Sequence, residues 1–189
     1  MRIVAGEFRG RRLVAPPGTG TRPTSDRVRE SLFSIVGSVD GDVVLDLFAG
    51  TGALGIEALS RGAASAVAVE RDRNAVRAIR TNAEALALGD RLRVVPRGWR
   101  EALRAEAEAG SRFDLVLIDP PYDLLADITA DLGAAVAQVL SPGGVVVLEH
   151  ARGAMMGAGG LPDIGASDAT TRRYGDTEIT VMWTAGAGT

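Results

Sequence analysis

The sequence contains no cysteine and no lysine, and it has a single histidine. Without cysteine the chain forms neither a disulfide nor a thiolate metal site, and one histidine excludes an imidazole-rich metal site. All 21 basic residues are arginine, whose planar head can bind phosphate through two hydrogen bonds. No apolar run reaches the roughly 18 residues of a membrane span, and arginines interrupt the first residues, so we expect a cytoplasmic protein without membrane contact.

The charge of the chain is unevenly distributed. Its 189 residues, 46% of them hydrophobic, suffice for one good core, and the formal net charge is −3. Residues 1–30 hold seven arginines and three acidic residues, a balance of +4, so the remainder must sum to −7. A basic arm on an acidic body indicates nucleic-acid binding. The alternative is a β-hairpin whose exposed edge is protected by charge.

The stretch Val43–Gly55 predicts a strand, a glycine turn and a helix. Apolar residues lead into Asp46, the run breaks at Gly50 and Gly52, and helical spacing of apolar residues begins at Leu54. Glycine allows a positive φ and carries no Cβ, so the backbone can approach a ligand closely with helix N-terminal N–H groups pointing at it. This arrangement suits a nucleotide-like cofactor.

The spacing of the glycines leaves two cofactors open. Gly50, Gly52 and Gly55 follow the dinucleotide fingerprint, and Glu70 stands twenty residues after Gly50 at the end of the next apolar run. A carboxylate there can bind the ribose diol of NAD or of S-adenosylmethionine. Another part of the chain must therefore decide between them.

The apolar run 113–118 predicts a buried strand that ends in Asp119-Pro120-Pro121-Tyr122. Two prolines fix φ and lack N–H groups, so we expect a rigid, extended exit with carbonyls outside any helix ladder. Asp119 and the Pro120 carbonyl can then accept the hydrogens of an exocyclic amine while Tyr122 stacks on the base. A dehydrogenase has no evident need for this arrangement.

These motifs carry a family resemblance. Asp46–Gly52, Glu70 and Asp119–Tyr122 together resemble the class I S-adenosylmethionine-dependent methyltransferases that act on exocyclic amino groups of nucleic-acid bases. More narrowly, the chain is similar to the RsmD family, which methylates a guanine N2 of 16S ribosomal RNA, over residues 10–13, 22–30 and 52–62. The resemblance covers nearly the whole chain, and its family-specific part is residues 22–30.

The motifs and the resemblance together assign roles to individual positions. We expect the cofactor to be bound by Arg22, Thr24, Asp46, Phe48, Gly50, Thr51, Gly52, Glu70 and Arg71. Catalysis is expected to fall to Asp119, Pro120 and Tyr122. We expect RNA to be bound by Arg9, Arg11, Arg12 and Arg27. Residues 22–36 are predicted to be helical, and the alternative for Arg27 is that it pairs with acidic neighbours along that helix.

The third predicted strand, residues 92–95, departs from the family pattern. The resemblance implies a polar or acidic residue just after it to hold the adenine amine, whereas Pro96-Arg97-Gly98-Trp99 stands there. Stacking on Trp99 or a backbone contact could replace it. We favour a core position for Trp99 in the following helix.

Alternating strands and helices predict an α/β, Rossmann-like class I methyltransferase fold. We expect a mostly parallel sheet with helices on both faces and ligands at the carboxyl ends of the strands. The resemblance implies seven strands and an antiparallel hairpin at the end, which fits residues 170–184. A helix over 124–140, a turn at 141–144 and a strand over 145–148 precede it. We divide the chain into a basic N-terminal β-hairpin arm, residues 1–21, and a methyltransferase domain, residues 22–189.

The leading hypothesis is a methyltransferase that transfers a methyl group from S-adenosylmethionine to guanine N2 of 16S rRNA, as naked RNA or in the small ribosomal subunit, and that works as a monomer. The Asp-Pro-Pro-Tyr motif alone leaves an adenine-N6 methyltransferase of DNA or RNA as an alternative. A nicotinamide-dependent oxidoreductase and a non-catalytic RNA-binding module are further alternatives. The module would bind RNA with a steep salt dependence but show no turnover.

Overall fold

The computed structural model describes residues 1–15, 26–153 and 161–186, without the side chains at positions 122, 123 and 126. The helices are α1 Asp26–Val36, α2 Ala53–Ser60, α3 Arg73–Ala85, α4 Trp99–Glu108 and α5 Tyr122–Ala137, with a 3₁₀ turn at Gly89–Arg91. The strands are β1 Val43–Leu47, β2 Ser65–Val69, β3 Leu92–Val95, β4 Phe113–Ile118, β5 Leu140–Ala151, β6 Ala166–Tyr174 and β7 Thr177–Thr184. None of the described helices is both long and apolar enough to cross a membrane.

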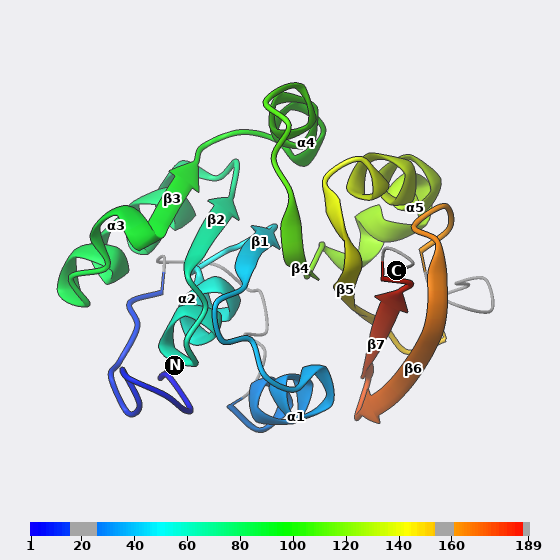
Figure 1. Cartoon of the computed structure of the whole chain (residues 1–189). Coiled ribbons are helices and arrows are strands. Elements are labelled where there is room, and N and C mark those ends of the chain that lie inside the picture. Colours follow the sequence, from blue (N-terminus) through cyan, green and yellow to red (C-terminus); the bar gives the residue numbers. More distant parts are fainter. Residues whose placement is uncertain (16–25, 154–160, 187–189) are drawn as a thin grey trace.

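The described strands form one seven-stranded sheet in the order β3-β2-β1-β4-β5-β7-β6 (Figure 1). The first five strands of this order are parallel, and β7 pairs antiparallel with both β5 and β6. The predicted seven strands and the closing hairpin are therefore present. The sheet is mixed rather than parallel throughout, because the hairpin returns the chain against the direction of β5.

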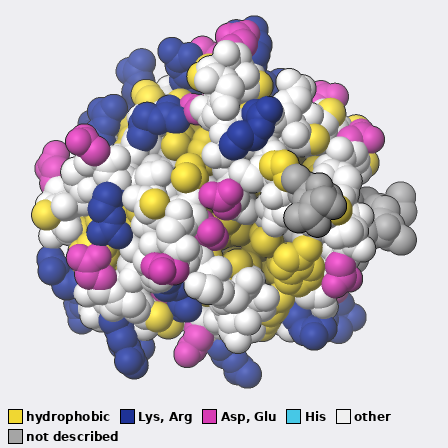
Figure 2. All heavy atoms as spheres, viewed as in Figure 1, with side chains coloured by type: hydrophobic (Ala, Val, Ile, Leu, Met, Phe, Trp, Pro, Cys, Tyr) yellow, Lys and Arg dark blue, Asp and Glu magenta, His cyan; other side chains and the backbone are white. Residues whose placement is uncertain are grey.

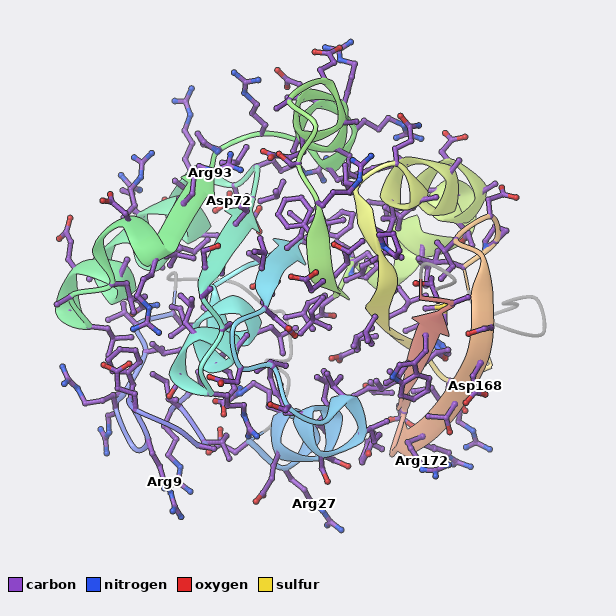
Figure 3. All side chains as sticks on the ribbon, in the orientation of Figure 1. Arg9, Arg27, Asp72, Arg93, Asp168 and Arg172 are labelled. Carbon is purple, nitrogen blue, oxygen red and sulfur yellow. The ribbon has the colours of Figure 1, made fainter. Side chains whose placement is uncertain are left out.

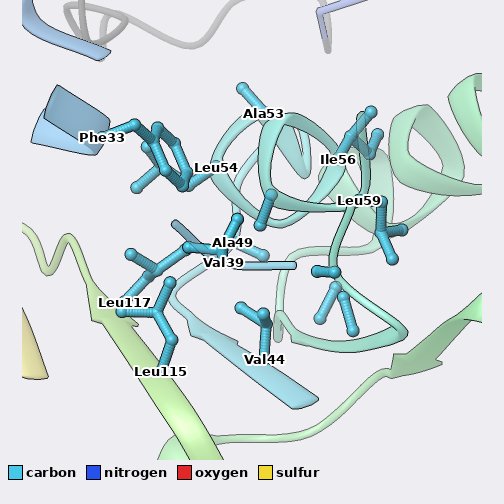
Figure 4. Close-up of a cluster of buried hydrophobic side chains, with 14 of the residues drawn as sticks. Phe33, Val39, Val44, Ala49, Ala53, Leu54, Ile56, Leu59, Leu115 and Leu117 are labelled. Atoms are coloured by element: carbon cyan, nitrogen blue, oxygen red, sulfur yellow. The ribbon is translucent and has the colours of Figure 1, made fainter. Parts of the chain in front are cut away.

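Helices cover both faces of the sheet, as predicted. In Figure 1, α1 and α2 lie below the strands and α4 and α5 lie above them. Successive residues of β1 point to opposite faces, so Val44 packs in the core cluster of α1, α2 and α3, whereas Leu45 packs in that of α4 and α5. Figure 4 shows the first cluster, in which Phe33 of α1 meets Leu54 of α2 above the strand residues. A strand buried on both sides needs an apolar run without alternation, which is what this sequence provides.

Residues 1–15 pack against the domain instead of standing away from it. Ile3 and Leu13 are buried in the core cluster of α2. The two limbs of this segment run antiparallel, with a bridge between Arg2 and Arg12 and a hydrogen bond from Ile3 N to Arg11 O of 3.0 Å. Within these residues the pairing is limited to this isolated bridge and its neighbouring bonds, so no extended strand forms.

The prediction around residues 124–148 was wrong in its boundaries. Helix α5 starts at Tyr122 and ends at Ala137, and β5 begins at Leu140, so the expected turn at 141–144 lies inside a strand. Phe113 pairs with Leu140 and Leu115 pairs with Val145, which places three extra residues on the β5 side of the ladder. The glycine and proline residues that indicated a turn form an irregularity in the strand, a role these residues commonly have.

Candidate active site

The candidate site lies where the carboxyl ends of three neighbouring strands meet. Leu47, the last residue of β1, is paired with Val69 of β2 on one side and with Ile118 of β4 on the other. Glu70 and Asp119 each follow these partners directly and therefore flank the end of β1. The chain order of the strands reverses between β1 and β4, which is the point where open α/β sheets bind ligands.

The glycine turn after β1 is held in an unusual backbone conformation. Phe48, Gly50 and Gly52 all have positive φ angles, of 62°, 55° and 76°. Only glycine adopts such angles without cost, so the value at Phe48 indicates that its surroundings impose the conformation. A Cβ added at Gly50 would meet nothing nearer than Phe48 O at 3.9 Å, so the backbone there borders open space.

Glu70 fastens this turn to the start of α3. Its Oε2 accepts a hydrogen bond from Gly50 N at 2.9 Å, and its Oε1 accepts one from Asp72 N at 2.8 Å. Asp72 in turn caps α3, because its side chain accepts from the N–H groups of Asn74 and Ala75. The half-buried carboxylate of Glu70 therefore orients two loops and keeps further acceptor capacity on each oxygen.

Asp46 lies beneath the turn and is buried. Its Oδ2 accepts a hydrogen bond from Gly55 N at 2.9 Å, which ties β1 to the first turn of α2. Burial raises the pKa of Asp46 to about 7, opposed by the bond from Gly55 and increased by the negative charge of Glu70. Because it faces the helix, Asp46 supports the turn from below rather than at its open side.

The exit of β4 carries the predicted catalytic segment. Asp119 is half-buried, its N–H lies 3.5 Å from Leu47 O, and Pro120 is buried. Pro121 is the N-cap of α5 with φ −52° and ψ 133°, so the chain is extended there as predicted. Its carbonyl accepts a hydrogen bond from Leu124 N at 3.0 Å, which corrects the expectation that this carbonyl lies outside helical bonding. The side chain of Tyr122 lies outside the described residues.

The structure describes some of the other residues predicted to bind the cofactor. Thr51 is half-buried in the turn, and Arg71 is exposed just after Glu70. Arg22 and Thr24 lie outside the described residues. Trp99 is only 8% exposed and packs in the core cluster of α4, so the core interpretation of this residue is confirmed.

The predicted RNA-binding arginines lie on the surface. Arg9, Arg11, Arg12 and Arg27 are all exposed, and Figure 3 shows Arg9 and Arg27 extending from the same side of the molecule. Arg11 donates to Ala85 O at the end of α3, at 2.8 Å. Figure 2 shows one face on which arginines and acidic side chains alternate around the margin, while hydrophobic side chains and a few acidic ones lie in the middle.

The alternative for Arg27 was a charge pair along its own helix. The described acidic residue at the start of α1, Asp26, instead binds Arg2 at 2.9 Å and Arg29 at 2.7 Å. Although burial alone would raise it, the pKa of Asp26 is lowered by the hydrogen bond from Arg2 and the charges of both arginines. Among the described ion pairs, none involves Arg9, Arg12 or Arg27, whereas Arg100 and Arg104 of α4 both have acidic partners.

Sequence reasoning missed three buried polar residues that organise the region: Arg29, Glu57 and Asn82. The fully buried Glu57 accepts hydrogen bonds from Val4 N and Ala5 N and pairs with Arg61 at 2.9 Å. The signal was a polar residue on the apolar side of a helix, as where Asn82 follows the core residue Ile79 by three positions.

Comparisons with known proteins agree with this geometry. Residues 1–183 match the family model described as "Conserved hypothetical protein 95". The chain is 41% identical over 156 residues to YlbH of Bacillus subtilis (strain 168), named as a candidate rRNA methyltransferase, covering 80% of this chain and 83% of that protein. It is 44% identical over 123 residues to the ribosomal RNA small subunit methyltransferase D of Escherichia coli (strain K12), covering 65% of this chain but only 60% of that protein.

Two solved structures are also similar. An Escherichia coli protein described as a candidate methyltransferase superimposes with a TM-score of 0.79 at 32% identity, covering 99% of both chains. The Thermus thermophilus 16S rRNA N2 G1207 methyltransferase RsmC, solved with AdoMet and guanosine, gives a TM-score of 0.68 at 25% identity, covering 89% of this chain and 44% of that one. The chain therefore belongs to the conserved hypothetical protein 95 family, the RsmD family that its sequence resembles.

Proposed function

We propose that this protein transfers a methyl group from S-adenosylmethionine to the exocyclic N2 of a guanine in 16S rRNA. The observation that carries the proposal is the convergence of Glu70, the glycine turn and Asp119 around the end of β1. Glu70 can bind the ribose of a methyl donor and Asp119 can bind the amine of a base, and both residues lie at the same edge of the sheet. The rRNA methyltransferase named among the relatives and the guanosine in the RsmC structure support this choice of substrate.

The residues present fit S-adenosylmethionine. The turn at Gly50 borders open space, and Glu70 keeps acceptor capacity for a ribose diol beyond its two backbone bonds. When bound, the sulfonium cofactor supplies an electrophilic methyl group that needs no metal. Phe48, Thr51, Gly52 and Arg71 complete the proposed cofactor surface, with Asp46 supporting it and Arg22 and Thr24 as further proposed ligands.

The protein's part in the reaction is to position a weak nucleophile. The lone pair of a guanine amine is conjugated with the ring, so alignment and charge stabilisation matter more than proton removal. Asp119 and the Pro120 carbonyl accept the two amine hydrogens and stabilise the positive charge that grows on nitrogen. Tyr122 stacks on the base. The proton leaves after transfer, because the methylated ammonium is acidic.

Exposed arginines of the arm and of α1 form the proposed RNA surface. Arg9, Arg12 and Arg27 are exposed, and their positive charges can neutralise phosphates. An arginine paired with a carboxylate, such as Arg104, binds phosphate more weakly because its charge is already partly neutralised. Arg11 joins them from the same arm. We expect a monomer that acts in the cytoplasm, where ribosomal RNA is modified, on 16S rRNA or on a small-subunit assembly particle.

The test is transfer of tritium from labelled S-adenosylmethionine to 16S RNA and to small ribosomal subunits that lack the modification. The labelled nucleoside is identified after digestion. We expect label on guanine N2, and we expect Asp119→Ala to abolish it while the affinity for S-adenosylhomocysteine is kept, because Asp119 acts on the base. Asp127→Ala, an exposed substitution on α5, is the control. Label on adenine N6 would favour the alternative methyltransferase, and no label with either RNA would overturn the proposal.

A further inference from the structure

We propose that Asn82 is a positioning residue that couples the N-terminal arm to the glycine turn, so that RNA and cofactor bind cooperatively. This inference rests on the proposed function, because it takes the arm as part of the RNA surface and the turn as part of the cofactor site. Asn82 is in α3, is only 2% exposed, and belongs to neither surface itself.

The side chain of Asn82 bonds two separate segments at once. Its Oδ1 accepts a hydrogen bond from Val14 N at 2.8 Å, and its Nδ2 donates to Val14 O at 3.1 Å. The same Nδ2 donates to Thr51 O in the glycine turn at 3.0 Å. One buried amide thus holds Val14 of the arm by both of that residue's backbone groups and holds the turn by a third bond.

The start of the arm contacts the same turn. The Thr51 hydroxyl lies 3.5 Å from Met1 Sδ, and Arg29 of α1 approaches that sulfur at 3.7 Å while donating to Arg2 O at 2.5 Å. Met1 therefore contacts Thr51 directly, and Val14 is joined to Thr51 through the side chain of Asn82. The contact at Asn82 is the stronger of the two, because a buried amide side chain makes three hydrogen bonds to backbone groups there, rather than a contact to sulfur.

Buried hydrogen-bonding groups that lose their partners cost free energy, and this makes the two docking events interdependent. If the arm leaves, Asn82 loses both bonds to Val14, and its remaining bond to Thr51 is no longer fixed in direction. If the turn shifts, the amide that clamps Val14 shifts with it. RNA that holds the arm in place therefore favours the turn geometry that binds cofactor, and by linkage cofactor favours RNA to the same extent.

A second anchor of the arm provides a matched control. Ser60, at the end of α2, accepts from Phe8 N at 2.9 Å and donates to Ala5 O at 2.6 Å. These bonds fasten the middle of the arm, and none of the described bonds of Ser60 reaches the turn. Ser60→Ala therefore loosens the arm without removing a contact to Thr51.

The experiment measures the affinity for S-adenosylhomocysteine by equilibrium dialysis, without RNA and with saturating unmodified 16S RNA. In the unaltered protein we expect RNA to tighten binding on the order of fivefold, the lower end of typical coupling. In Asn82→Ala the ratio of the two affinities should fall to about one. In Ser60→Ala the ratio should persist, although more RNA is needed to reach saturation.

A second variant addresses the loss of fold that a buried substitution can cause. Val14 is exposed, and Val14→Pro removes the N–H group that donates to Asn82 Oδ1. In this variant the ratio of the two affinities should also fall to about one. A ratio of one in the unaltered protein, or an unchanged ratio in both Asn82→Ala and Val14→Pro, would overturn the inference. If the protein binds the cofactor and methylates RNA, these outcomes leave the proposed function standing; if it binds no cofactor at all, the proposed function itself fails.

Discussion

Asp46 and Gly55 are nine residues apart in the chain, and the buried carboxylate of the first accepts a 2.9 Å hydrogen bond from the backbone of the second. This bond sets the distance between the end of β1 and the first turn of α2, which is the distance that the glycine turn must span. The site therefore depends on an acidic group that burial makes costly to ionise. Two predictions follow from this contact.

The first prediction concerns pH. The pKa of Asp46 rises from 3.8 to about 7 on folding, so the folded chain binds this proton more tightly. The stability contributed by the protonated group is complete below about pH 4 and is lost as the pH rises through 7. Asp46→Asn removes this titration. As the pH rises from 5 to 8, the free energy of unfolding of this variant should therefore increase relative to that of the unaltered protein. The change between these two pH values is at most about 3 kcal/mol. Urea unfolding of both proteins at pH 5 and at pH 8 measures this change. A difference in stability between the two proteins that is the same at both pH values would contradict the prediction.

The second prediction concerns the lack of room for a side chain at Gly55. A Cβ at Gly55 would lie 3.1 Å from Asp46 Oδ2, and the carboxylate is buried and cannot easily retreat. Gly55→Ala should therefore destabilise the protein by about 1–3 kcal/mol, although alanine normally favours a helix. Gly98→Ala is the control, because a Cβ there meets nothing within 4 Å. Thermal unfolding of the two variants should differ clearly, and similar melting temperatures would show that Asp46 can move.

The sequence was sufficient to predict the carboxyl ends of β2 and β4. Apolar runs without alternation predicted buried parallel strands, and the polar residues that follow them, Glu70 and Asp119, had to lie at one edge because parallel strands end together. The predicted turn at residues 141–144 failed because glycine and proline indicate a break in regular pairing without saying whether the strand resumes.

Contacts between distant segments could not be predicted from local patterns. Asn82, Glu57 and Arg29 each stand on the apolar side of a helix, which reveals that they need a partner. Their partners include backbone groups of the arm, which carry no sequence signal because every residue has such groups. The docking of the arm therefore became visible only in three dimensions.

Glu70 gives a third prediction. Both of its oxygens accept backbone N–H bonds, so Glu70→Gln would turn an amide N–H toward Gly50 N or Asp72 N and disturb the turn. We expect the affinity for S-adenosylhomocysteine to fall by about tenfold or more, since a charged hydrogen bond is worth on the order of 1.5–3 kcal/mol. Glu84→Gln, an exposed change on α3, is the control. Calorimetric titration measures the affinity of both variants for S-adenosylhomocysteine. If Glu70→Gln and Glu84→Gln bind it equally well, Glu70 is not part of the cofactor site.

Arg9 and Arg27, which have no acidic partner among the described ion pairs, give a fourth prediction. Arg9→Ala and Arg27→Ala should each weaken the binding of 16S RNA and lower the slope of log affinity against log salt by about 0.7–0.9, the contribution of one phosphate contact. Arg104→Ala is the control, because this arginine pairs with Glu108 at 3.9 Å on α4. Filter binding across a range of salt concentrations separates them. A slope that changes only in the control would place the RNA on another face.

Two glycines in the arm, Gly6 and Gly10, allow its docking to be tested directly. Both have positive φ, of 78° and 83°, so alanine is strained at either position by about 1–2 kcal/mol. A Cβ at Gly6 would also lie 1.7 Å from the backbone oxygen of Ser60, whereas one at Gly10 meets nothing within 4 Å. Gly6→Ala must therefore displace the arm from α2 and break the 2.7 Å bond from Glu7 N to Ser60 O.

We expect Gly6→Ala to lose at least about 2 kcal/mol more stability than Gly10→Ala, because the displaced arm also exposes Ile3 and leaves the buried Glu57 without its backbone donors. Urea unfolding gives the difference, and limited proteolysis should cleave the first 15 residues faster in Gly6→Ala alone. Equal losses in the two variants would mean that the arm's docking adds nothing to stability beyond the strain of the turn. A larger loss at Gly6 would instead show that the arm is an integral part of the folded domain.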